Sequence, residues 1–136
     1  MELIYSLDQI KEIATKLLDL YANRPVWAFF APMGAGKTTL ISQICKQLGV
    51  AQAVSSPTFA IMNLYEANNN DIYHMDWYRL SDEAEAIRTG VEAAMEECDL
   101  CFIEWPEKAP GLLPEHTLKI NIEILDPEHR RIFITS

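Results

Sequence analysis

The sequence has few cysteines, no long apolar run and no recognisable targeting signal. Three cysteines among 136 residues, Cys45, Cys98 and Cys101, are too few and odd in number for the disulfide framework of a small secreted domain. No apolar stretch approaches the ~18 residues that span a bilayer, and residues 1–4 lack the positive start of a secretory signal peptide. These absences predict a cytoplasmic protein with reduced thiols that does not contact the membrane.

Positive charge is also scarce. Eleven Lys and Arg face twenty Asp and Glu, which leaves a formal charge of −9 that repels phosphate backbones. A nucleic acid would therefore have to be held mainly by partner proteins, unless a local basic patch forms around Arg79, Arg130 or Arg131. The 136 residues, 49% of them hydrophobic and 23% charged, predict one globular domain over residues 1–136 with a single core.

Short apolar runs predict the strands. Two runs, 26–30 and 100–103, are apolar throughout, as is typical of strands buried on both faces of a parallel sheet. Antiparallel hairpins are predicted from 60–65 with 72–75, and from 118–124 with 131–134. We therefore expect an α/β fold in which a mostly parallel central sheet is flanked by helices and carries antiparallel hairpins.

Apolar residues at helical spacing predict three helices. The first spans 6–21, where Ser6 and Gln9 form a capping box, and the second spans 37–48 and ends at Gly49. The third is capped by Ser81 and continues to about Glu97.

Residues 31–38, Ala-Pro-Met-Gly-Ala-Gly-Lys-Thr, have the spacing of a Walker A motif, with Ala31 where the first glycine usually stands. The motif lies between a predicted buried strand and a predicted helix, as phosphate binding requires. Lys37 would place its ammonium on the β- and γ-phosphates, and the Thr38 hydroxyl would bind Mg²⁺. The backbone N–H groups that cradle the phosphates belong to Gly34, Ala35, Gly36, Lys37, Thr38 and Thr39.

Two acidic residues follow predicted strands and are candidates for the metal and for catalysis. Glu104 stands at the carboxyl end of 100–103, where ligands bind in open α/β sheets, although a solvated strand end is the alternative. Asp76 follows 72–75 and is either a second metal carboxylate or a turn former. Trp105 either stacks on a nucleotide base or fills the core.

The cysteine pair Cys98-x-x-Cys101 suggests redox or zinc chemistry only weakly. A zinc site needs a second ligand pair, and Cys101 lies in an apolar strand, so packing is the favoured interpretation.

The class of nucleotide protein follows from what is missing. No Asn-Lys-x-Asp motif for reading guanine is present, and the five arginines are scattered rather than grouped in a kinase lid. ATP hydrolysis or ATP-gated binding is therefore favoured over a GTPase, with a small-molecule kinase as a further alternative.

Four motifs together resemble the bacterial TsaE family: residues 31–39, Ser-Pro-Thr-Phe at 56–59, His-Met-Asp-Trp-Tyr-Arg-Leu at 74–80 and Ile-Glu-Trp-Pro-Glu at 103–107. The resemblance runs from about Ser6 to Phe133. It implies a P-loop ATPase that acts with a threonylcarbamoyl transferase subunit and its dimerising companion, of the TsaD and TsaB type. These partners modify the adenosine beside the tRNA anticodon, and ATP hydrolysis resets the complex between turnovers.

The resemblance also assigns roles to residues. Thr38 and Glu104 match the Mg²⁺ ligands, and Asp76 matches an acid that acts on metal or water. Thr58 matches a switch-like loop whose order depends on the γ-phosphate. We predict slow hydrolysis of Mg·ATP, in which Lys37 offsets charge and Asp76 or Glu104 orients the attacking water. A non-catalytic nucleotide-gated adaptor is the alternative.

Two departures stand out against the family pattern. Ala31-Pro32-Met33 replaces the usual Gly-Asp-Leu, and Trp77 replaces Leu.

Overall fold

The computed structural model describes residues 1–55, 57 and 61–135. The strands are β1 (Glu2–Ser6), β2 (Val26–Phe30), β3 (Met62–Ala67), β4 (Asn70–Asp76), β5 (Leu100–Glu104), β6 (Leu118–Ile124) and β7 (His129–Thr135). The α-helices are α1 (Ile10–Tyr21), α2 (Lys37–Leu48), α3 (Glu83–Arg88) and α4 (Val91–Glu97), and short 3-10 helices are η1 (Leu7–Gln9), η2 (Pro106–Lys108) and η3 (Pro110–Leu112). None of the helices in the described ranges is both long and apolar enough to cross a lipid bilayer.

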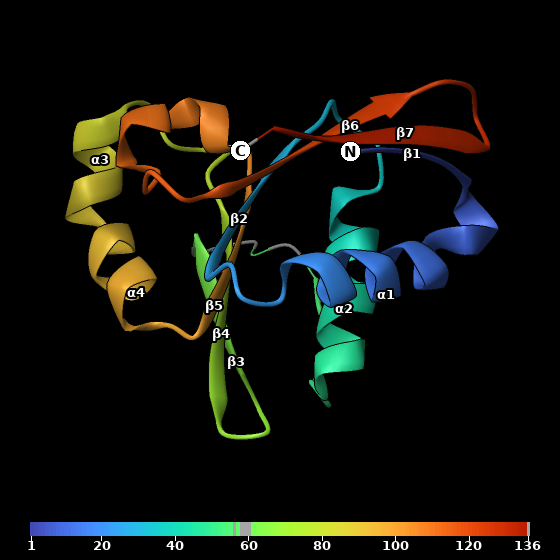
Figure 1. Cartoon of the computed structure of the whole chain (residues 1–136). Helices are drawn as coiled ribbons and strands as arrows, with labels where there is room; N and C mark the ends of the chain where they lie inside the picture. The colour runs from blue at the N-terminus through green and yellow to red at the C-terminus, as the bar shows by residue number, and fades with distance from the viewer. Residues whose placement is uncertain (56, 58–60, 136) are drawn as a thin grey trace.

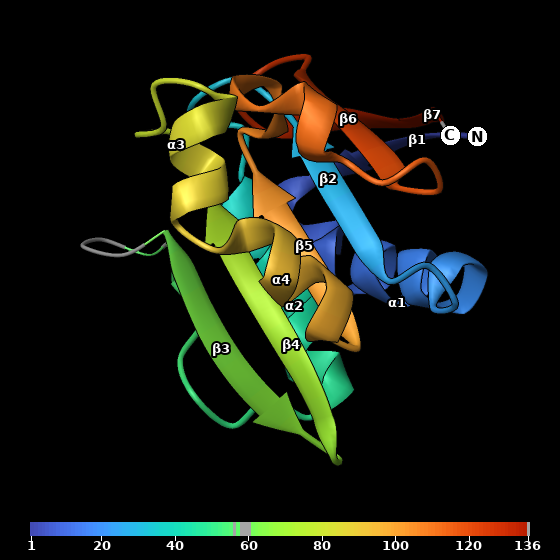
Figure 2. The ribbon, with the colours of Figure 1, turned by 90° about the vertical axis from the view of Figure 1, so that its left-hand side faces the viewer.

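The seven strands form one sheet in the order β1-β7-β6-β2-β5-β4-β3. The middle strands β6, β2, β5 and β4 run parallel, whereas β1, β7 and β3 each pair antiparallel with a neighbour. Helices α1 and α2 cover one face of the sheet, and α3 and α4 cover the other (Figures 1 and 2). The predicted α/β fold, with its mostly parallel sheet and two antiparallel hairpins, is confirmed.

The two central strands supply both cores, as their continuous apolar runs predict. Trp27 of β2 and Phe102 of β5 face α1 and α2 and meet edge to face with ring centroids 5.4 Å apart. Val26 and Ile103 face the opposite side and pack in the core beneath α3 and α4. Every residue of β5 is buried, because both faces of this strand are covered.

The predicted first helix is present but begins differently. The capping box exists, since the Gln9 side chain accepts a hydrogen bond from the Ser6 N–H at 2.9 Å. One turn of 3-10 helix, η1, precedes α1, whose buried stripe consists of Ile13, Ala14 and Leu17.

Strand β1 was not predicted from the sequence. It pairs antiparallel with β7, with Ile4 opposite Arg131, and so joins the two ends of the chain at one edge of the sheet. The pattern of residues 2–6 has only one buried position, Tyr5, and is too short to show a strand period. A distant partner strand makes this segment extended.

The predicted helix from Ser81 to Glu97 is wrong in two details. It consists of two helices, because Gly90 adopts a left-handed backbone conformation (φ 86°) that interrupts the helical ladder between α3 and α4. The cap of α3 is Asp82, whose carboxylate accepts a hydrogen bond from the Glu85 N–H at 2.8 Å. The Ser81 hydroxyl instead contacts the Glu85 carboxylate.

The hairpin of β3 and β4 turns at Asn68 and Asn69, both with positive φ. Strand β4 continues as far as Asp76, which places that residue at the carboxyl end of a strand beside β5. Residue 60, the start of the predicted strand, lies outside the described residues.

Candidate functional site

The carboxyl end of β2 leads into α2 through a glycine loop, residues 31–36. Gly34 and Gly36 have φ values of 80° and 91°, which side chains with a Cβ rarely adopt, and so the loop needs glycine at both positions. Gly36 is the N-cap of α2 and supplies no capping side chain. The first N–H groups of α2 are therefore positioned to bind an anion.

Ala31 fits the loop without strain. Apart from glycines, the described residues with positive φ are Asn68, Asn69 and Trp105, so the backbone at position 31 does not require glycine. Its carbonyl oxygen instead accepts a hydrogen bond from Lys37 Nζ at 3.1 Å.

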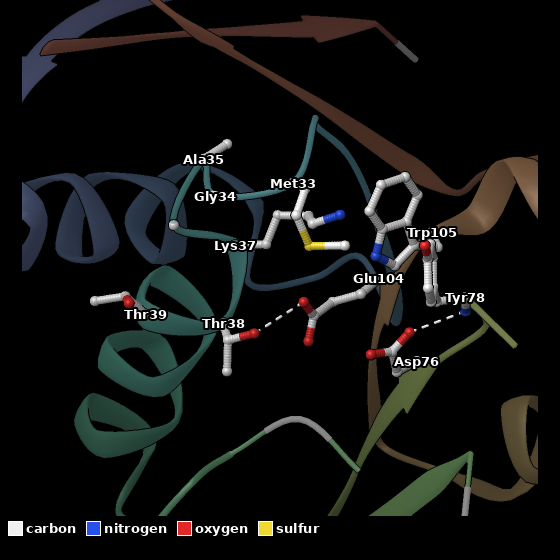
Figure 3. Close-up of a pocket in the computed structure, with 11 residues that line it drawn as sticks. Met33, Gly34, Ala35, Lys37, Thr38, Thr39, Asp76, Tyr78, Glu104 and Trp105 are labelled. Atoms are coloured by element: carbon white, nitrogen blue, oxygen red, sulfur yellow. Dashed lines mark hydrogen bonds between the residues drawn. The ribbon is translucent and has the colours of Figure 1, made fainter. Parts of the chain in front are cut away.

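A pocket of about 410 Å³ lies over the start of α2 (Figure 3). Its lining comes from the glycine loop, from α2 and from the ends of β4 and β5: Met33, Gly34, Ala35, Gly36, Lys37, Thr38, Thr39, Asp76, Tyr78, Glu104 and Trp105. The fold thus brings together all the predicted site residues except Thr58, which lies outside the described residues.

Lys37 is buried and its ammonium has two neighbours. Besides the Ala31 carbonyl, Nζ lies 3.5 Å from the centroid of the Trp105 ring, which is a cation–π contact. Burial lowers the pKa of the Lys37 ammonium, while the negative charges of Glu104, Glu107 and Asp76 oppose this effect. The ammonium is held at the wall of the pocket by contacts that it can exchange for anionic oxygens.

Glu104 ends β5 and is only 3% exposed, so it is not a solvated strand end. Its Oε1 accepts a hydrogen bond from the Thr38 hydroxyl at 2.9 Å, as Figure 3 shows. Its Oε2 lies 2.6 Å from Nε2 of His74, a fully buried residue of β4. The carboxylate therefore links α2 to β4 at the floor of the pocket.

Asp76 ends β4 directly beside Glu104, to which it is paired in the β4–β5 register. Its Oδ1 accepts a hydrogen bond from the Tyr78 N–H at 2.9 Å, so it does form a turn. The side chain is half-buried and also lines the pocket. Burial raises the pKa of the Asp76 carboxyl, and the Tyr78 N–H partly offsets this. The two sequence-based interpretations of Asp76 are thus compatible.

Trp105 lies at the pocket and not in the core. It has a positive φ of 59°, which costs a residue with a Cβ about 1 kcal/mol. Its ring packs against Tyr78, with centroids 5.0 Å apart, and also contacts the Lys37 ammonium.

Sequence reasoning missed three residues of this region: Met33, Tyr78 and His74. The strand period of two places His74 on the same face of β4 as Asp76, and this signal could have identified it. Met33 and Tyr78 are exposed at the pocket rim by 65% and 47%, and nothing in their spacing indicates that position.

The donors fit a hard cation. The Thr38 hydroxyl and the Glu104 and Asp76 carboxylates offer oxygen atoms, which Mg²⁺ prefers, and Mg²⁺ usually takes one or two carboxylates together with phosphates and water. Among the described residues, no group of three or more His, Cys, Asp or Glu side chains is arranged to hold a metal by itself.

Of the three arginines considered for a basic patch, Arg79, Arg130 and Arg131, the last two are engaged with other residues of the protein. Arg130 is buried, and its Nε donates a hydrogen bond to the carbonyl oxygen of Ala35 in the glycine loop at 3.1 Å. Arg131 forms ion pairs with Glu2 (2.8 Å) and Glu123 (2.9 Å). Both guanidinium groups are engaged within the protein.

Comparison with known proteins identifies the family of this chain. The family model described as "Threonylcarbamoyl adenosine biosynthesis protein TsaE" matches residues 4–132. The chain is 35% identical over 117 residues to a tRNA threonylcarbamoyladenosine biosynthesis protein TsaE of Haemophilus influenzae, covering 85% of this chain and 74% of that protein. A TsaE protein of Rickettsia conorii is 33% identical over 131 residues, covering 96% and 74%.

A solved structure shares the fold. The crystal structure of Bacillus subtilis YdiB superposes with a TM-score of 0.73 at 26% identity, covering 100% of this chain and 86% of that one. With the family model matched over nearly the whole sequence, the chain belongs to the TsaE family of threonylcarbamoyl adenosine biosynthesis proteins.

Proposed function

We propose that this protein is a Mg²⁺-dependent ATPase that serves the synthesis of threonylcarbamoyladenosine in tRNA. The observation that carries the proposal is the convergence of Lys37, the Thr38–Glu104 hydrogen bond and the uncapped start of α2 in one pocket. The names of the relatives supply the pathway. We further propose that the protein hydrolyses ATP and does not only bind it.

The residues of the pocket have different proposed roles. The N–H groups at the start of α2 and the Lys37 ammonium bind the phosphates of ATP. Thr38 and Glu104, with Asp76, would hold Mg²⁺, which when bound neutralises charge on the phosphate oxygens. Asp76 or Glu104 orients the attacking water, since both carboxylates line the same pocket.

The charge of this chain indicates that it needs partner proteins to act on tRNA. With a net charge of −9, with Arg130 buried and with Arg131 paired to two surface carboxylates, this chain is poorly suited to hold tRNA alone. From the resemblance to the TsaE family, we propose that it acts with a transferase subunit and its companion, of the TsaD and TsaB type, and that hydrolysis resets their complex between turnovers.

The phosphate role is tested by calorimetric titration of Mg·ATP into Lys37→Ala. We expect binding to be abolished, because the variant loses the buried ammonium. Lys46→Ala is the matched control, since Lys46 lies on the same helix but is exposed. An unchanged affinity in Lys37→Ala would sink the proposal.

Glu104→Gln separates an ATPase from an adaptor. The variant should retain ATP but fail in multiple rounds of tRNA modification by the reconstituted complex, because the carboxylate charge is lost. Full multiple-turnover activity would favour the nucleotide-gated adaptor. Transfer of the labelled γ-phosphate to a metabolite instead of water would indicate a kinase.

A further inference from the structure

His74 lies beneath the site and belongs to none of the roles described so far. Its ring is fully buried on β4, and its Nε2 lies 2.6 Å from Oε2 of Glu104, which is itself 3% exposed. Its ring lies beside that of Tyr65, with the two ring centroids 6.4 Å apart. The pair is therefore enclosed by protein, where a hydrogen bond to a carboxylate is strong.

The two oxygens of Glu104 have different partners. Oε2 faces His74 and Oε1 faces the Thr38 hydroxyl at 2.9 Å. A carboxylate with one hydrogen bond can still rotate about its last torsion, which has a broad energy profile. Two bonds from opposite sides, one from β4 and one from α2, hold the plane of the group.

The second ring nitrogen identifies the tautomer. Nδ1 of His74 is buried and has no hydrogen-bond partner among the described residues. A ring with its proton on Nε2 donates to Glu104 and leaves only a lone pair at Nδ1, whereas the other tautomer would bury an unpaired N–H and set two acceptors face to face. The hydrogen bond thus runs from His74 to Glu104.

We propose that His74 is a positioning residue that orients the Glu104 carboxylate so that Oε1 faces Thr38 and the metal side of the pocket. The proposal rests on the proposed function, in which Thr38 and Glu104 serve Mg²⁺. It assigns His74 no contact with ATP. Outer partners of metal-binding side chains typically change metal affinity 10- to 100-fold when they are removed.

The test compares His74→Leu, which removes the donor, with His74→Gln, whose amide nitrogen can reach about the position of Nε2. Calorimetry measures the affinity for ADP with and without Mg²⁺ in each variant. In His74→Leu the gain in affinity from Mg²⁺ should fall about tenfold, while metal-free ADP binds as in the wild type. His74→Gln should recover most of the gain. His129→Gln is the control, since His129 is exposed and its ring bonds only to Asp126 among the described residues.

A second readout needs no nucleotide. In proton NMR spectra of the nucleotide-free protein, the Thr38 hydroxyl proton should exchange slowly with water in the wild type and in His74→Gln, so that its signal is visible. In His74→Leu the exchange should be fast and the signal should disappear. If His74→Leu does not fold, His74→Asn, whose amide is too short to reach Glu104, replaces it in both measurements.

The outcomes distinguish the two proposals. Retention of both the Thr38 proton and the full Mg²⁺-dependent gain in His74→Leu would overturn the positioning role and leave the ATPase proposal intact. Absence of any Mg·ADP binding by the wild type would overturn the proposed function, and the Thr38 proton would still decide whether His74 orients Glu104.

Discussion

Lys37 and Glu104 are charged side chains buried close to one another, and burial of either alone would be costly. Each is retained through specific partners: the Ala31 carbonyl and the Trp105 ring for Lys37, and Thr38 with His74 for Glu104. The Walker A spacing predicted Lys37, and the end of a buried strand predicted Glu104. These patterns did not predict Trp105 or His74 as their partners, because these contacts arise only where α2, β4 and β5 meet.

The three cysteine thiols should be alkylated at very different rates. Cys98 is half-buried, and a hydrogen bond with Cys101 lowers the pKa of its thiol. Burial raises the pKa of Cys45 to about 12, and the bond to Cys98 together with burial raises that of Cys101. We expect iodoacetamide to modify Cys98 at least ~10-fold faster than the other two, as read by mass spectrometry of peptides.

Cys98→Ser provides the control for this labelling. Only slow labelling should remain in that variant, at the rate at which the fold opens. Equally fast labelling of Cys45 or Cys101 in the wild type would contradict the expected order. Slow labelling of Cys101 would also support the interpretation that this cysteine of the Cys-x-x-Cys pair is packed in the core.

Tyr5 gives a pH dependence of stability. Burial raises the pKa of its hydroxyl from 10.0 to about 12. The folded state therefore keeps the proton where the unfolded state loses it, so this contribution is complete below pH 10 and is lost as the pH rises through 12. At pH 11 the loss is about 1.4 kcal/mol, because the unfolded-state pKa lies one unit below this pH and each unit is worth about 1.36 kcal/mol.

The measurement is urea unfolding at pH 8 and pH 11 in reductant. Tyr5→Phe should show a smaller fall in the free energy of unfolding between these two values than the wild type. An identical fall in both proteins would mean that Tyr5 does not titrate differently in the folded and unfolded states.

At the scale of elements, single residues decide where helices end. Acidic residues at 82, 83 and 85 and apolar residues further on predicted one long helix, but the left-handed Gly90 divides it into α3 and α4. A glycine inside a helical pattern is often tolerated, so its effect on the path of the chain was not evident from the sequence.

Gly90→Ala should lower the free energy of unfolding by about 1 kcal/mol, since alanine is strained at φ 86°. Apart from Gly90 and its two neighbours in the chain, no described residue has an atom within 4 Å of the position that a Cβ would occupy, so the loss reflects backbone conformation and not a clash. Gly90→Asn should lose less, because asparagine tolerates this region. Chemical denaturation of the two variants checks this, and a larger loss for asparagine would contradict it.

The glycine loop is tied to the opposite end of the chain by Arg130 of β7. Besides Ala35, its guanidinium donates hydrogen bonds to the carbonyl oxygens of Asp126 (2.8 Å) and His129 (3.0 Å). Arg130→Met should therefore lower the free energy of unfolding by about 2 kcal/mol, because the buried Ala35 carbonyl loses its Arg130 donor and two part-buried bonds are lost as well. Arg131→Met, one residue away, removes surface ion pairs and a cation–π contact with Phe133, and should have a much smaller effect.

Thermal and urea unfolding of the two arginine variants measure this difference. Equal losses in both would show that the internal hydrogen bonds of Arg130 contribute no more than the surface ion pairs. The comparison is matched, since the residues are adjacent on one strand and the substitution is the same.

At the scale of the whole molecule, one sheet separates two cores. Leu17 belongs to the core beneath α1 and α2 and is fully buried, whereas Leu20 on the same helix is 52% exposed. Leu17→Ala should cost about 3 kcal/mol of unfolding free energy, as for buried leucines in general. Leu20→Ala should change it by no more than about 0.5 kcal/mol. Urea titration of both variants tests the assignment, and similar losses would contradict it.

The amino-acid sequence determined the fold class, the two buried central strands and most of the candidate site. These features follow from local patterns: apolar runs at 26–30 and 100–103, helical spacing, and a glycine-rich segment that ends in Lys37 and Thr38. Glu104 and Asp76 were predicted because the carboxyl ends of strands meet at one edge of a parallel sheet.

Only the tertiary structure decided the remainder. Strand β1 exists because β7, from the other end of the chain, pairs with it. The hydrogen bond from His74 to Glu104 and the tie from Arg130 to Ala35 join residues 30 and 95 positions apart. A strand period can place His74 on the face of Asp76, but it does not show which side chains these residues contact, because the partners meet only after the sheet has assembled.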